Sequence, residues 1–270
     1  MADTEELLTG EAKSECDKLY RFIFPIGTVI IGGAGDSHFI DCANQELHQF
    51  FSTGAGQTPN EKMTPASLLL ALNTFAAKFY RETTGAYRGF AYESIPRIEM
   101  LIAVNCNQQT MLFRWMHNRV VWISPPLHAS VGSGVSHIHP MLRDIQFSAS
   151  KECMLFYGMK MMFHAKRTVI GVGGATEAIA LQDDGRAHYF GTSVLRKIEE
   201  LAVNYEEFKT KVLDGMFSTI AVTDPKIEPE LEANIQSRLA KLGEDLKTYR
   251  QAYKDILKPQ LVAQKSMENK

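Results

Sequence analysis

The chain has 270 residues, of which 45% are hydrophobic and 22% charged, a balance typical of a soluble globular protein. Its formal net charge of −2 at pH 7 indicates no strongly basic face, so nucleic acid is not an expected partner. The apolar stretches are shorter than the roughly 20 residues of a membrane span, and the acidic, polar N-terminus does not resemble a secretory signal.

The four cysteines, Cys16, Cys42, Cys106 and Cys153, lie far apart and include no Cys-x-x-Cys pair. This spacing predicts reduced, mostly buried thiols in a cytoplasmic protein, and it indicates neither a disulfide framework nor a zinc site. We expect no metal or other cofactor.

The first predicted elements are two short β segments within residues 18–35, joined at 25–27. Residues 28–31 form a continuous apolar run closed by glycines, which is typical of a buried strand. Asp36 stands where a helix N-cap belongs. Apolar residues then follow at helical spacing: Phe39, Ile40, Ala43, Leu47, Phe50 and Phe51.

A second helix begins after a loop over 52–62, with Thr64 as N-cap and Pro65 at the first helical position. Two antiparallel strands are predicted near 97–105 and 110–123, joined by a turn at 105–107.

Gly132 and Gly134 open a third helical stretch, and a fourth helix over 152–166 is apolar nearly all round. Residues 175–182 and 186–191 have the pattern of a β-hairpin closed by Asp183-Asp184-Gly185. This order of elements favours an α+β domain over a doubly wound one.

The C-terminal tail differs in kind, because from residue 228 apolar residues recur every three or four positions over about three heptads. The members of this stripe are Ile235, Leu239, Leu242, Leu246, Tyr249, Tyr253 and Ile256. We therefore predict a domain over 1–220 and a helical extension over 228–270. The helix packs on its own domain, or it serves self-association or the docking of a partner.

Two segments carry a family resemblance. The first runs from Ala2-Asp3 through Lys18 to the glycine-rich turn that ends at Asp36. The second is Gly132-Ser133-Gly134, followed by Gly173-Gly174 and the hairpin. In order and spacing over roughly residues 2–215, these segments resemble the proteasome-type subunits of the N-terminal-nucleophile hydrolase superfamily.

The resemblance implies a four-layer αββα sandwich of two antiparallel sheets that assembles into rings, with peptides or proteins as substrates. It implies a threonine-type peptidase in which an N-terminal threonine attacks and its own α-amine acts as base. Lys18 matches the lysine of that site and Asp3 the aspartate that holds it. Gly32 matches the oxyanion glycine, and Ser133 the serine near the amine.

The chain also departs from the family pattern. The threonine belongs roughly fifteen residues before Asp3, a β-hairpin's length, yet the sequence begins at Met1. Val169 and Val172 occupy the positions of a second aspartate and serine, with Lys166, Arg167 and Thr168 nearby. As written, the chain has no nucleophile and lacks its first strand.

Three explanations are open. The true start lies upstream of Met1, or the protein is a non-catalytic structural or assembly subunit of the same fold. The third, Thr4 as a processed nucleophile, would place the hydroxyl after the strand and away from Lys18.

His137 and His139 would face the same way on an extended segment. We nevertheless expect them to face solvent or cap an element, because the sequence places no third metal ligand beside them.

Overall fold

The computed structural model describes the chain in segments. These are residues 2–3, 5–7, 13–15, 18–24, 27–54, 63–87, 95, 97–124, 129–143, 151–169, 172–221, 233, 236–241, 243–248 and 250–251. They group into two compact units: 1–147 with 164–189, and 148–163 with 190–270.

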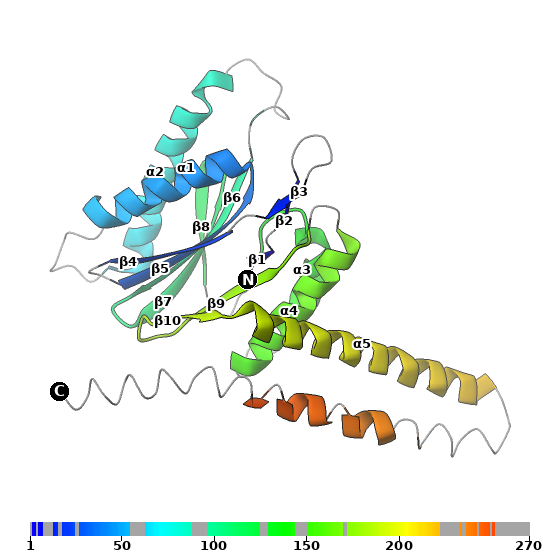
Figure 1. Ribbon diagram of the computed structural model, residues 1–270. Coiled ribbons are helices and arrows are strands. Elements are labelled where there is room, and N and C mark those ends of the chain that lie inside the picture. Colours follow the sequence, from blue (N-terminus) through cyan, green and yellow to red (C-terminus); the bar gives the residue numbers. More distant parts are fainter. Residues whose placement is uncertain are drawn as a thin grey trace, which may run out of the picture. The chain divides into compact units, whose positions relative to one another are not determined.

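A five-stranded antiparallel sheet forms the centre of the first unit, with the strands in chain order from edge to edge (Figure 1). The strands are β4 (Leu19–Phe24), β5 (Gly27–Gly35), β6 (Ile98–Cys106), β7 (Gln109–Met116) and β8 (Arg119–Ile123). The strands predicted around residues 18–35 and 97–105 are confirmed. Residues 110–123, however, form two strands, because the chain reverses at His117 with a φ of 52°.

The turn between β6 and β7 lies at Asn107 and Gln108, whereas the predicted turn is centred on Cys106. Both residues have positive φ angles, 52° and 63°, as a two-residue hairpin turn with the right-handed strand twist requires.

Two helices, α1 (Ser37–Gln49) and α2 (Pro65–Thr83), pack on one face of this sheet. Asp36 caps α1 by accepting a hydrogen bond from the Phe39 N–H at 3.2 Å, and Thr64 caps α2 in a reciprocal pair with Ser67. Both predicted N-caps are therefore confirmed. The fully buried Trp115 packs edge to face on Phe79, with the ring centroids 5.5 Å apart, and this contact stabilises the packing of α2 on β7.

The opposite face of the same sheet holds the predicted hairpin, β9 (Thr176–Leu181) and β10 (Ala187–Phe190). Thr28 and Asn105 pair across β5 and β6, and both are buried. The Thr28 hydroxyl donates to the Gly185 carbonyl at 2.6 Å. The Asn105 amide donates to the carbonyls of Gln182 at 3.1 Å and Asp183 at 3.0 Å, so the hairpin turn is tied to the sheet.

Three further strands are short. β1 (Ala2–Asp3) pairs with β9 to complete a three-stranded sheet, and β2 (Glu5–Leu7) pairs with β3 (Lys13–Glu15). A 3₁₀ turn over 85–87 follows α2 and a π-helical turn over 50–54 follows α1.

The predicted third helix is α3 (Val135–Arg143). His137 and His139 therefore lie on a helix, and the extended segment assumed from the sequence is wrong.

The second unit is helical in its described part. α4 (Lys151–Thr168) contributes its first 13 residues, and α5 (Thr192–Ala221) follows, a helix that the sequence reading did not include. Lys160 of α4 pairs with Glu206 of α5 at 2.5 Å, and Phe156 packs edge to face on Tyr205. The described tail over 236–241 and 243–248 is helical, with Leu239 51% and Leu246 40% exposed. The remaining stripe residues, Ile235, Leu242, Tyr249, Tyr253 and Ile256, lie outside the described residues.

The α+β class is thus confirmed, whereas the four-layer order and the division at residues 220–228 stay predictions. Among the residues described, no helix is both long and apolar enough to cross a bilayer.

We predict that Asn105→Ala lowers the free energy of unfolding by about 2 kcal/mol, because two half-buried turn carbonyls and Thr110 lose their donor. Urea denaturation measures this loss. Gln109→Ala, at an exposed position of the β6–β7 hairpin, is the control and should stay within about 0.5 kcal/mol of wild type. An equally small loss for Asn105→Ala would contradict the role given to this side chain.

Candidate functional site

Lys18 and Gly32, predicted to act together, are neighbours in the structure. The Lys18 carbonyl accepts a hydrogen bond from the Gly33 N–H at 3.3 Å, and the next residue, Leu19, pairs with Gly32. A Cβ added to Gly32 would lie 3.1 Å from Leu19 Cδ2 and 3.8 Å from the Lys18 carbonyl oxygen. Because Gly32 has no side chain, the first residues of β4 can pair closely with β5.

Asp3 reaches the same region through β9. Asp3 pairs with Thr176, and Ala2 pairs with Glu177. A Glu177 carboxylate oxygen in turn accepts a hydrogen bond from the Lys18 backbone N–H at 3.4 Å. Two adjacent residues of β9 thus connect the strand that carries Asp3 with the residue that begins β4.

Ser133 lies in a turn at the C-terminal end of β5. The Gly132 N–H donates to a carboxylate oxygen of Glu99 at 3.1 Å, and Glu99 pairs with Ala34 of β5. Gly132 has a φ of +96°, and a Cβ there would lie 3.0 Å from the Ala34 Cβ. Ser133 itself is exposed. The Lys18 backbone, Gly32 and the turn that carries Ser133 therefore lie beside the C-terminal half of β5, whereas Asp3 is linked to Lys18 only through β9.

The lining beside this turn is apolar. A Cβ on Gly134 would lie 3.9 Å from a Val172 methyl and 3.6 Å from the Ala165 Cβ. The Val169 N–H donates a hydrogen bond to the Ala165 carbonyl at 2.8 Å, at the C-terminal end of α4. The nearby Thr168 hydroxyl donates to the His164 carbonyl of its own helix at 2.9 Å. Because methyl groups neither donate nor accept hydrogen bonds, Val172 offers no partner to an amine at this position.

Two residues that shape this region were missed by sequence reasoning: Glu177 and Glu99. A signal existed for Glu99, since it is a charged residue at the start of a strand whose neighbours Ile98 and Met100 are fully buried. Glu177 has no charged neighbour in the sequence that would draw attention to it. Its contact with Lys18 depends on long-range pairing such as that of β9 with β1, which a local sequence pattern does not reveal.

The described residues include no group of three or more His, Cys, Asp or Glu side chains that could hold a metal ion. His137 is exposed on α3, where positions two apart point to different sides of the helix. The surroundings of His137 thus give no support to a metal site.

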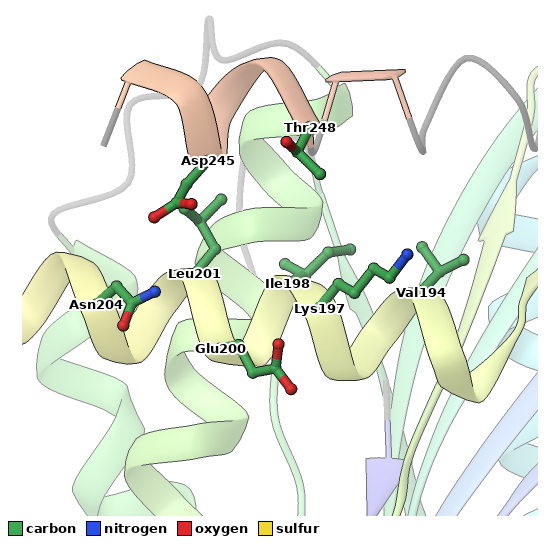
Figure 2. A pocket seen from close by; sticks show the side chains of 8 residues that line it. All are labelled: Val194, Lys197, Ile198, Glu200, Leu201, Asn204, Asp245 and Thr248. Atoms are coloured by element: carbon green, nitrogen blue, oxygen red, sulfur yellow. The ribbon is translucent and has the colours of Figure 1, made fainter. Parts of the chain in front are cut away.

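A separate pocket lies in the second unit, between α5 and the tail (Figure 2). Val194, Ile198 and Leu201 line it from α5, and Asp245 and Thr248 from the tail. Its volume is about 230 Å³, smaller than the roughly 300–1,000 Å³ of most ligand sites. We take it to be the groove between two packed helices, so the region around β5 remains the stronger candidate.

Solved structures of Anbu proteins share this fold. The chain matches Anbu (ancestral beta-subunit) from Yersinia bercovieri with a TM-score of 0.56 and 15% identity, over 83% of this chain and 92% of that one. It matches Anbu from Hyphomicrobium sp. strain MC1 with a TM-score of 0.57 and 13% identity, over 83% and 93%. It matches Anbu from Pseudomonas aeruginosa, a helical assembly, with a TM-score of 0.53 and 13% identity, over 73% and 86%. No protein-family model and no curated protein sequence matches the chain.

These matches correct the family inferred from the sequence. The sequence identifies the chain as a proteasome-type subunit lacking its first strand and catalytic threonine, and that identification is wrong, because three solved structures that it matches over 73–83% of its length are Anbu proteins. At this identity they show a proteasome-like fold alone. The physical reason is that the matched motifs meet needs of the fold: Asp36 caps α1, and a Cβ on Gly33 would lie 2.6 Å from Ile40 of that helix. Such positions do not distinguish one family of the fold from another.

We predict that Gly132→Ala destabilises the protein by about 1.5 kcal/mol, because its positive φ is costly for a residue with a Cβ. The control is Gly85→Ala, where an added Cβ meets nothing within 4 Å, and this variant should be neutral or slightly stabilised. Thermal and urea unfolding of both variants measure the difference. Equal free energies of unfolding for the two variants would show that Gly132 does not have the positive φ angle described for the turn at Ser133.

Proposed function

We propose that this chain is a non-catalytic structural or assembly subunit with a proteasome-like fold. The observation that carries the proposal is that the space beside Gly134, where an added Cβ would lie, is bordered by the methyl groups of Val172 and Ala165. The chemistry of an N-terminal-nucleophile site would need a hydrogen-bonding group where Val172 stands, and a valine side chain cannot supply one.

The chemistry explains why this lining matters. In an N-terminal-nucleophile peptidase the threonine's α-amine takes the proton from the hydroxyl, and hydrogen bonds must hold that amine in place. A polar group left without partners away from water costs roughly 1–3 kcal/mol, so methyl groups at this position disfavour a correctly placed amine. The apolar surroundings of Gly134 therefore support the proposed non-catalytic role.

Self-assembly is the second part of the proposal. The Anbu complex from Pseudomonas aeruginosa forms a helical assembly, and we expect this chain to form a homo-oligomer, as a ring or a helical array. We propose that exposed large apolar side chains take part in these contacts; in the tail they are Leu239 and Leu246. In the first unit they include Ile23, 67% exposed, and Leu70, 71% exposed. A cytoplasmic location and the lack of nucleic-acid partners remain predictions.

One observation favours a second candidate, a threonine-type amide hydrolase. The Lys18 backbone pairs beside Gly32 and Gly33, and the turn that carries Ser133 approaches Ala34 of the same strand. In this alternative Lys18 would favour the reactive form of the nucleophile by its charge, and a backbone N–H at Gly32 would stabilise the oxyanion.

A peptidase assay separates the two candidates. We predict no hydrolysis of fluorogenic peptides above the buffer rate, and the same result for Lys18→Ala. Participation of Lys18 in proton transfer would make the variant slower than wild type by a factor of about 10² or more. Such a Lys18-dependent rate would overturn the non-catalytic proposal, whereas an equal background rate in both proteins supports it.

Light scattering tests assembly through the tail. We predict that the wild-type protein has a mass several times the 30.3 kDa of one chain. Deleting residues 228–270 should lower that mass, as should Leu239→Lys combined with Leu246→Lys, since both leucines are exposed on helical turns. Lys241→Ala, at an exposed position between them, is the control. A mass unchanged by the deletion would exclude the tail as the assembly surface.

A further inference from the structure

The apolar stripe of the tail does not face α5, the helix on which the tail lies. Asp245 and Thr248 are the tail residues that line the pocket on α5 (Figure 2). Because an α-helix turns by about 100° per residue, Thr248 lies about 160° around the helix from Leu246 and about 180° from Leu239. Leu239 and Leu246 are accordingly 51% and 40% exposed. The packing on α5 therefore leaves the apolar side of the tail largely open to solvent.

A third side of the tail is polar. Glu244 and Lys247 form an exposed ion pair at 2.8 Å. Both residues lie at least about 80° around the helix from Leu239 and from Leu246. The tail thus has one side toward α5, one charged side and one exposed apolar side, a pattern typical of a helix whose apolar side packs on a further element.

We propose that the apolar stripe of the tail packs on the same stripe of a second copy of this chain, as a parallel, in-register coiled coil. This inference rests on the proposed self-assembly and names the surface through which two copies meet. The stripe repeats with the spacing 4-3-4-3 over residues 235–256, which places Leu239 and Leu246 at heptad position a. Each leucine then inserts between residues of the other helix and is removed from water.

The charges beside the stripe favour a second tail as the partner and set its direction. Asp245 occupies heptad position g, and Arg250 occupies the following position e. In a parallel pair, position g of one helix faces the following position e of the other. Asp245 of each chain then meets Arg250 of the other, and the twofold symmetry of the pair forms this contact twice. Arg250 is exposed and Asp245 half-buried on the tail helix.

An antiparallel pair is disfavoured by the same residues, because in that direction g faces g and e faces e. A pair that overlaps the whole stripe then sets Asp245 against Asp245 or Ala252 of the other chain. Arg250 meets Gln236 or Gly243. The antiparallel direction therefore offers either a repulsive contact or no ion pair.

Charge exchange across the seam tests the proposal in the full chain, by sedimentation velocity at low ionic strength. Asp245→Arg and Arg250→Asp should each raise the concentration at which the tails dissociate by roughly tenfold or more, because each variant sets like charges opposite each other. The combination of both changes restores opposite charges and should return that concentration to within about threefold of wild type.

Lys241→Asp is the matched control, since it changes the charge by the same amount as Arg250→Asp at an exposed position away from the stripe. This variant should dissociate at the same concentration as wild type. Circular dichroism checks that every variant keeps its helices.

A disulfide cross-link tests the direction of the pair, with Leu239→Cys in a Cys153→Ser background that removes an exposed native thiol. In the parallel pair the two introduced thiols lie side by side, so oxidation by diamide should link the two chains at position 239. An antiparallel pair separates these positions by about ten or more residues of helix, roughly 15 Å or more, which a disulfide cannot span.

The outcomes separate this pairing from the proposed self-assembly. A monomeric wild-type protein would contradict both. An oligomer that is insensitive to the two single charge variants, or that forms no disulfide at position 239, would leave self-assembly standing and overturn the parallel pairing of the tails.

Discussion

The hydrogen bonds from Thr28 and Asn105 to the β9–β10 turn are the constraint on which the arrangement of the first unit depends. Both side chains are buried, so their polar atoms need partners, and the turn carbonyls supply them. Gly185 completes the fit, since a Cβ there would lie 3.1 Å from the Asn105 amide oxygen. With the turn fixed, β9 runs alongside β4, and Glu177 reaches the Lys18 N–H.

Local chemistry made much of this fold predictable. Asp36 and Thr64 cap their helices as the sequence indicates, and the hairpin closed by Asp183-Asp184-Gly185 forms as expected. The turn at His117 was missed because its positive φ is carried by a residue other than glycine, with no proline or glycine beside it. For α5 a signal was present, in buried Leu195, Ile198, Leu201 and Ala202 at helical spacing.

The candidate site was predictable in part for a different reason. The positions of Gly32, Lys18 and Ser133 depend on turns and close packing of the fold, which is why motif spacing points to them, and their roles stay predictions. Contacts across the fold, such as that of Glu177 with Lys18, depend on strand pairing and are not visible in a local pattern. The same dependence on fold explains why these motifs led to the wrong family.

Around β5, the backbone geometry and the chemistry of the side chains have different origins. Glycines and strand pairing maintain the backbone geometry around the C-terminal half of β5, while Val172 lies near the turn that carries Ser133. A fold hosts many functions, and the function is decided by the groups placed on it. The proposed non-catalytic role rests on the valine near the Ser133 turn.

Intact-mass spectrometry of the protein after incubation with a peptide epoxyketone tests this central claim most directly, because that electrophile forms a covalent adduct with a threonine that has a free α-amine. The account predicts that the mass of the chain stays unchanged. A stoichiometric adduct mapped to an N-terminal threonine would contradict it.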